Sequence, residues 1–175
     1  LINIYNTGNI TSNANQIGGI VGLNGQEGTI TNSYNLGNIS SGTANCVGGI
    51  VGQNNNYYIY KPVIKNCYNI DSLTSEKAKG IIGFNNISAS NDNVAENCYY
   101  YDKDNKHNYK DVGQYFTKLE TLKRTRNLGL EDDFIDSPPH INQGYPRLRL
   151  KSINYGFPAV KINHQNMAKL NLALQ

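Results

Sequence analysis

A five-residue phrase returns along the first half of the chain and limits what the chain can fold into. Residues 18–22 read Gly-Gly-Ile-Val-Gly, the same five residues stand at 48–52, and a weaker copy, Lys-Gly-Ile-Ile-Gly, stands at 79–83. Gly19 to Gly49 is 30 positions and Gly49 to Gly80 is 31. A recurrence at this period is typical of stacked structural repeats, in which each unit packs mainly on its neighbours.

A second recurring phrase predicts that the repeats are built from strands. Each glycine phrase is preceded by a Tyr-Asn phrase, at Tyr5, Tyr34 and Tyr68, and a fourth start stands at Tyr99. Residues 1–101 carry no apolar pattern of helical spacing; short runs of Ile, Val, Tyr and Thr are broken by Gly and Asn instead. We therefore expect an all-β fold, a parallel β-solenoid of about three to four coils over 1–101, with three short strands per coil.

Stacking predicts ladders of like residues, because equivalent positions of neighbouring coils lie about 4.8 Å apart. Gly8 and Gly37 are expected at a corner that needs positive φ. Ile20, Ile50 and Ile81 are expected to line the interior. The predicted ladders are Asn3, Asn32, Asn66 and Asn97; Tyr5, Tyr34, Tyr68 and Tyr99; Asn6, Asn35 and Asn69; and Gly19, Gly49 and Gly80.

The repeat ends near Tyr101, and the remainder is predicted to be a small mixed cap over residues 102–150 that covers the exposed coil ends, followed by a tail at 151–175. The cap is expected to contain one helix from about 117 to 128, since Thr117 and Glu120 have capping-box spacing and Gly129 suits a helix stop. Residues 142–148 predict a turn that leads into a short strand.

At these residues the chain resembles proteins that carry the GLUG motif. The motif phrase is matched by residues 19–22 and 49–52, its Tyr-Asn-x-Gly-x-Ile phrase by 5–10 and 34–39, and the Asn-x-Gly-Tyr-Pro segment that often follows the repeats by 142–146. Such repeats occur in bacterial surface and secreted proteins, including adhesin-like proteins and the non-catalytic part of some immunoglobulin A-cleaving zinc peptidases. The resemblance implies an extracellular or cell-surface location and transfers no functional residue.

Catalytic and metal-binding patterns are not found, so we expect neither an enzyme nor a cofactor. His107, His140 and His164 are 33 and 24 positions apart, which does not provide the paired histidines of a zinc peptidase. Residues 102–106 begin like a calcium loop, but Lys106 and His107 stand where the loop needs Asp or Asn and then Gly. A β-helix enzyme that cleaves acidic polysaccharides needs carboxylates along one face, but Asp71, Glu76 and Asp92 do not stand at equivalent repeat positions. Four acidic residues that could pair for glycoside hydrolysis lie in the expected cap and are interpreted as polar loop residues: Glu131, Asp132, Asp133 and Asp136.

The cysteines leave two interpretations open. Cys67 and Cys98 both precede the repeated tyrosine, so stacking brings them together and makes a disulfide geometrically possible. A ladder of small buried residues that also includes Ser33 is the favoured alternative. With Cys46 the count is three, and an odd count argues against a fully paired disulfide framework.

The surface suggests a binding role without nucleic acid. A net charge of +3 is too small to indicate a nucleic-acid partner, and no apolar run is long enough to span a bilayer. Four basic residues near the expected helix are read as a solvated face, with an anionic partner as the alternative: Lys118, Lys123, Arg124 and Arg126. Tyr57, Tyr58 and Tyr60 are candidates for contact with glycans or extracellular proteins, although packing against the solenoid is the simpler explanation.

The expected function is therefore a non-catalytic extracellular repeat module that serves in surface adhesion or as a structural stalk. The alternative is an accessory β-helix region of a larger secreted enzyme, a zinc peptidase or a polysaccharide-degrading enzyme, whose catalytic domain is absent here. The chain starts inside a repeat, so we expect it to be part of a longer chain.

Overall fold

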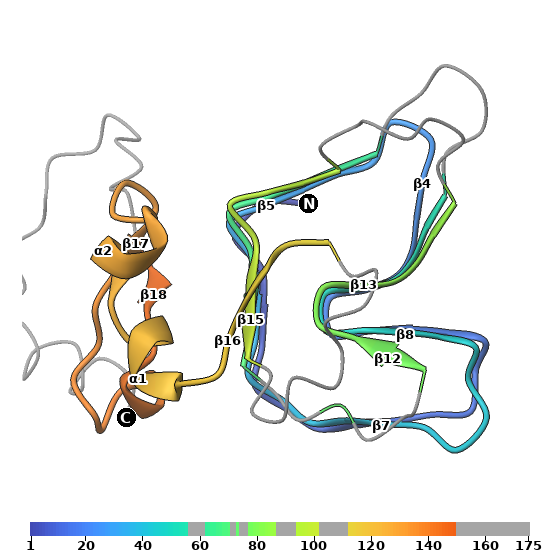
Figure 1. The fold of residues 1–175 in the computed structure, drawn as a ribbon, viewed down its shortest axis with the longest axis horizontal. Coiled ribbons are helices and arrows are strands. Elements are labelled where there is room, and N and C mark those ends of the chain that lie inside the picture. Colours follow the sequence, from blue (N-terminus) through green and yellow to red (C-terminus); the bar gives the residue numbers. More distant parts are fainter. Residues whose placement is uncertain (56–61, 71–72, 74–76, 87–93, 102–111, 150–175) are drawn as a thin grey trace, which may run out of the picture.

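Residues 1–101 form short strands that pair in parallel with their counterparts one repeat away. The structure, a computed structural model, describes residues 1–55, 62–70, 73, 77–86, 94–101 and 112–149. Successive repeats follow nearly the same path and lie one over another when viewed as in Figure 1. The strand-rich, parallel arrangement agrees with the predicted all-β class. The expectation of three strands per repeat is wrong, because five short strands are described between Tyr34 and Lys65.

Four parallel sheets and one strand pair make up this region. Tyr5 lies opposite Tyr34, Tyr34 opposite Tyr68, and Tyr68 opposite Tyr99, so the register advances by one repeat per strand. The largest sheet contains β1 (Tyr5–Asn6), β6 (Tyr34–Asn35), β11 (Tyr68–Asn69), β15 (Tyr99–Tyr101) and β16 (Gln114–Phe116). The second sheet contains β5 (Thr29–Thr31), β10 (Val63–Lys65) and β14 (Ala95–Glu96), and the third contains β3 (Gln16–Gly18), β8 (Cys46–Gly48) and β12 (Ala78–Lys79). The fourth sheet contains β4 (Val21–Gly25), β9 (Val51–Asn55) and β13 (Ile82–Asn86), and β2 (Ile10–Thr11) pairs with β7 (Ile39–Ser40).

Aliphatic side chains fill the interior between these sheets. Alternate residues of a strand point to opposite faces, and the apolar ones point inward. One cluster of buried residues contains Ile50 and Ile81 with Ile20 packed against it, as expected. A second contains Ile39, with Ile10 and Leu73 at its margin.

The C-terminal segment packs against the side of the repeats. After β16 adds to β15, the chain forms α1 (Leu119–Leu122), α2 (Thr125–Leu128), β17 (Phe134–Ile135), the 3₁₀ turn η1 (Asn142–Gly144) and β18 (Arg147–Leu148), with β17 and β18 antiparallel. Figure 1 shows these elements beside the sheet that contains β15 and β16. Only β16 extends an end of a sheet, so the described part of this segment mainly covers a lateral face rather than the coil ends.

The expected single helix over 117–128 is wrong, because the chain forms two one-turn helices. Arg124 between them is extended, at φ −125° and ψ 119°. Leu122 and Leu128 are both buried against the repeats. Six residues of continuous helix span about 1.7 turns and would turn these two side chains to different faces. The capping box is also wrong, since α1 begins after Lys118 without a side-chain cap. Gly129 does end α2, with φ 63°.

The expectation that Gly8 and Gly37 need positive φ is wrong. Gly8 and Gly37 do not have positive φ; among the described repeats the corner asparagines do, with φ from 49° to 61° at Asn3, Asn32, Asn66 and Asn97. Asparagine tolerates this left-handed conformation better than most residues. Gly37 is required for close approach, because a Cβ there would lie 2.0 Å from the Gly8 carbonyl oxygen.

Candidate functional site

The glycine phrase forms a tight reversal that joins β3 to β4 in the first repeat. A Cβ on Gly18 would lie 2.1 Å from the Val21 carbonyl oxygen, and one on Gly52 would lie 2.5 Å from the Ile17 nitrogen. Backbones that approach so closely leave no room for a side chain. Gly18 therefore allows β3 and β4 to fold back on each other, and Gly52 allows β9 to lie against β3 of the preceding repeat.

The middle glycine makes room for the next repeat. A Cβ on Gly49 would lie 2.1 Å from the Gly80 carbonyl oxygen and 2.3 Å from Nδ2 of Asn69, an inward-pointing residue one repeat later. Gly19 faces Asn35 in the same way, and Gly80 faces the ring of Tyr100. The row of Gly19, Gly49 and Gly80 is thus a stacking requirement rather than a ligand-binding loop.

Asparagine amides link the repeats inside the molecule. Asn6 Nδ2 donates to Asn35 Oδ1 at 2.8 Å, and Asn35 Nδ2 donates to Asn69 Oδ1 at 2.9 Å. The Asn35 side chain also holds its own turn, since its Oδ1 accepts from the Gly37 N–H and its Nδ2 donates to the Gly37 carbonyl oxygen. These buried amides pair with one another along the stack, as in cross-β assemblies.

Sequence reasoning missed further asparagine rows of the same kind. Asn24 Nδ2 donates to Asn54 Oδ1 at 2.9 Å, and Asn54 Nδ2 donates to Asn85 Oδ1 at 3.2 Å. Asn86 donates to Asn55 in the adjacent row. The signal was present, because Asn24, Asn54 and Asn85 recur at the period of the glycine phrase.

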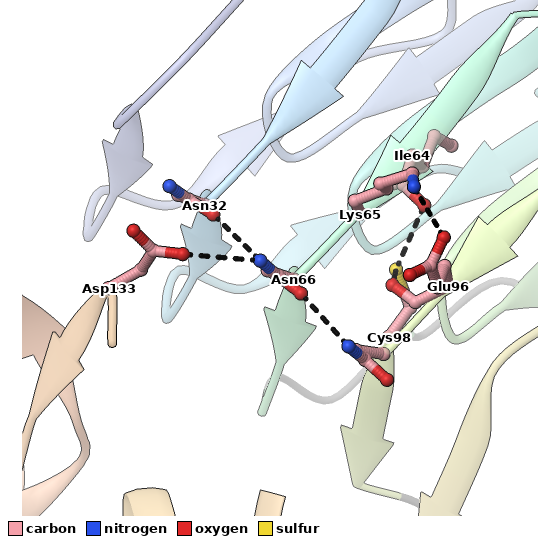
Figure 2. A network of polar contacts seen from close by, with 8 residues as sticks. Asn32, Ile64, Lys65, Asn66, Glu96, Cys98 and Asp133 are labelled. Atoms are coloured by element: carbon pink, nitrogen blue, oxygen red, sulfur yellow. Dashed lines mark hydrogen bonds and ion pairs between the residues drawn. The ribbon is translucent and has the colours of Figure 1, made fainter. Parts of the chain in front are cut away.

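The corner asparagines connect the repeats to the C-terminal segment. Asn66 Nδ2 donates to Asn32 Oδ1 at 3.1 Å and to Asp133 Oδ2 at 3.3 Å, while Asn97 Nδ2 donates to Asn66 Oδ1 at 3.2 Å. Figure 2 shows Asp133 reaching Asn66 from the side of the C-terminal segment. Among the acidic residues predicted from the sequence, Asp133 is therefore held by the corner row, and Asp136 by Arg124 and the Thr125 N–H.

Replacing Asn66 tests the two contributions of a corner asparagine. We expect Asn66→Ala to lower the free energy of unfolding by about 2 kcal/mol, because it loses the amide bonds and strains a left-handed residue. Asn66→Gly should cost about 1 kcal/mol less, since glycine adopts positive φ freely. Urea denaturation measures both, with exposed Asn13→Ala as control; equal losses for Ala and Gly would remove the backbone argument.

The tyrosine row forms the face that the C-terminal segment covers. The Tyr34 and Tyr68 rings stack with centroids 4.9 Å apart and planes 1° apart, and Tyr5 stacks on Tyr34 at 5.3 Å. The Tyr68 hydroxyl donates to the Pro146 carbonyl oxygen, and Tyr99 donates to the Leu128 carbonyl oxygen at 2.6 Å. Burial, assisted by neighbouring Tyr5, raises the pKa of Tyr34 to about 12, so the Tyr34 hydroxyl remains neutral near neutral pH.

The other candidates do not come together as a reactive centre. Within the described ranges, no three His, Cys, Asp or Glu side chains lie close enough to hold a metal ion. A pocket of about 160 Å³ includes Lys123 and Arg124, but Lys123 pairs with Glu120 and Arg124 with Asp136. The cysteines are free thiols, with Cys67 and Cys98 buried and Cys46 partly exposed. Tyr57, Tyr58, Tyr60, His107, His164 and residues 102–106 lie outside the described residues.

A comparison with protein-family models identifies the repeated segment. Among the described residues, no helix is both long and apolar enough to cross a membrane. Neither a curated protein nor a solved structure matches the chain significantly. The family model of the GLUG motif matches residues 13–40 and 43–74, and each match includes one glycine reversal and the tyrosine strand that follows it. The chain therefore carries two consecutive copies of the GLUG motif.

Proposed function

We propose that residues 1–101 are coils of a parallel β-solenoid, and that this solenoid is a non-catalytic extracellular module that presents a variable surface. The module acts as a stalk or an adhesion surface. The parallel pairing of each strand with its counterpart one repeat away supports the solenoid. The resemblance to surface and secreted proteins with GLUG repeats supports the location.

The functional proposal rests on a difference between the inward-facing and the outward-facing residues of β4, β9 and β13. On β4, β9 and β13 the row Asn24, Asn54 and Asn85 is the same residue in every repeat. The neighbouring row on the same strands is Leu23, Gln53 and Phe84, in which Leu23 is 50% and Phe84 46% exposed. A constant internal frame with a changing exposed row is what a presenting scaffold needs, because surface residues vary without loss of stacking.

The internal use of polar groups further supports a role without catalysis. The row amides donate to one another, and the tyrosine hydroxyls of Tyr68 and Tyr99 donate to carbonyl oxygens of the C-terminal segment. Active sites instead gather titratable groups with matched pKa values in a cleft. The repeats use their polar side chains to hold the fold.

The binding test concerns the tyrosines that the sequence places beyond β9. If the module binds extracellular glycans or matrix proteins, we expect Tyr57→Ala together with Tyr58→Ala to weaken binding about thirtyfold, because stacking by aromatic faces contributes on the order of 1 kcal/mol per ring. Binding to an immobilised panel of glycans and matrix proteins is measured by biolayer interferometry.

The matched control is Tyr5→Ala, which removes an exposed aromatic ring from the first repeat, outside the row of Leu23, Gln53 and Phe84. Binding that is unchanged in the tyrosine variant would exclude that loop as the adhesion site. No binding by the unaltered chain to any panel member would favour the stalk. Turnover of an acidic polysaccharide or a peptide by the chain would overturn the non-catalytic proposal.

A further inference from the structure

Cys67 and Cys98 stand in one row of the core, opposite each other on neighbouring repeats. The residues that follow them, Tyr68 and Tyr99, are partners in the parallel register, and the Tyr99 N–H donates to the Cys67 carbonyl oxygen at 2.9 Å. Neighbouring parallel strands are about 4.8 Å apart, which lies inside the Cα separation range of about 4.4–6.8 Å found for disulfides. The backbone therefore holds the two residues at bridging distance.

The two thiols also lie close together. Burial, and then the neighbouring Cys98 thiol, raises the pKa of the Cys67 thiol well above its usual value. Cys98 Sγ leans toward the preceding repeat, since it lies 3.6 Å from the Ile64 carbonyl oxygen, and Figure 2 shows this contact. Both residues belong to the same buried cluster, with 0% and 2% of their surfaces exposed.

Cys98 is the nearer of the two cysteines to an open pocket, although only 2% of its surface is exposed. It lines an open pocket of about 330 Å³ at the end of the repeats, together with Asn97, Gly113 and Gln114. Cys67 does not line this pocket. An external disulfide therefore meets Cys98 first, and Cys67 is placed to complete the exchange.

We propose that Cys67 and Cys98 form an intrachain disulfide that staples the third repeat to the fourth when the protein meets a disulfide oxidant. In the first step the Cys98 thiol loses its proton to solvent, and the thiolate attacks one sulfur of the oxidant and releases one thiol. In the second step the Cys67 thiol loses its proton, its sulfur attacks the Cys98 sulfur of the mixed disulfide, and the second thiolate of the oxidant leaves and takes up a proton. Two protein thiols are oxidised, and one external disulfide bond is reduced.

Serine is a well-matched replacement at this row. Ser33 occupies the same position one repeat before Cys67 and is fully buried. Its hydroxyl donates to the Thr31 carbonyl oxygen two residues earlier, as the Cys67 thiol donates to Lys65 and the Cys98 thiol to Glu96. Cys67→Ser therefore keeps the local hydrogen bond and removes the partner thiol.

The experiment uses the full chain with Cys46→Ser, which leaves two cysteines, since the chain has three. The protein is refolded in oxidised and reduced glutathione, then denatured and titrated for free thiols. We expect the free thiols to fall from two to none, with a cross-linked Cys67–Cys98 peptide in the mass spectrum. The thermal midpoint should rise by roughly 5–10 °C, since the bridge closes a long loop, and should return after dithiothreitol treatment.

The control carries Cys46→Ser and Cys67→Ser and should show no reversible rise in its thermal midpoint. Two thiols that remain free, a glutathione adduct without the cross-linked peptide, or cross-links only between chains would each overturn the proposal. A cross-linked peptide without a rise in the midpoint would also overturn it, because the bridge would then not staple the repeats.

Discussion

Gly49→Ala should lower the free energy of unfolding by about 3 kcal/mol, the upper part of the usual range for overpacking a core. The added methyl group would meet the Gly80 carbonyl oxygen at 2.1 Å and the Asn69 amide at 2.3 Å. The first of these atoms belongs to the backbone of the next repeat, so relief requires the two repeats to separate. Urea denaturation followed by circular dichroism measures the loss.

Gly25→Ala is the matched control for this substitution. Gly25 lies on β4, and a Cβ there would meet nothing within 4 Å. Alanine restricts the unfolded chain more than glycine, so the control should be neutral or more stable by about 0.5 kcal/mol. The two substitutions therefore have opposite expected signs. Equal effects at both positions would mean that the close approach at Gly49 does not limit the fold.

Tyr68→Ala should cost about 3–5 kcal/mol, as expected for truncation of a large buried aromatic side chain. The side chain is fully buried, stacks on Tyr34, and contacts the Phe134 ring with centroids 5.7 Å apart. It also donates to the Pro146 carbonyl oxygen. The substitution therefore weakens both the tyrosine row and the attachment of the C-terminal segment.

Two measurements separate these effects. Denaturation reports the loss of stability, and limited trypsin digestion reports whether the chain around Lys123 and Arg124 is released from the repeats. Tyr5→Ala is the control, since Tyr5 occupies the same row but is 59% exposed, and it should cost less than about 1 kcal/mol. A Tyr68 variant that unfolds like the Tyr5 variant, with unchanged digestion, would show that the C-terminal segment is held elsewhere.

Periodic features of the fold were predictable because they repeat in the sequence. Tyr34, Tyr68 and Tyr99 recur in the same phrase, and the structure places them opposite one another in parallel strands. The amide row of Asn24, Asn54 and Asn85 has the same period as the glycine phrase, so it too is encoded by the repeat. The sequence favours positive φ at Gly8 and Gly37, but Asn3 and Asn32, on the other side of the tyrosine strand, adopt it.

Features that depend on contacts between distant segments were not predictable in this way. The pattern at 117–128 favours one helix, yet Arg124 is extended and the chain turns so that Leu122 and Leu128 both reach the tyrosine face. Local propensity for a short helix is weak, and burial of two leucines outweighs it. The bond from Asn66 to Asp133 likewise joins residues 67 positions apart.

The sequence by itself determined the parallel stacking, because tyrosine and asparagine recur at the same positions of successive repeats. In parallel register each tyrosine ring lies beside another tyrosine ring, and each amide pairs with another amide. Only the tertiary structure showed the structural roles of the glycine phrase and the tyrosine row. Glycine is required where one repeat presses on the next, and the tyrosines are outward-facing rings that need a cover. The C-terminal segment provides that cover along the side of the repeats, where Leu122, Leu128 and Phe134 pack against the rings.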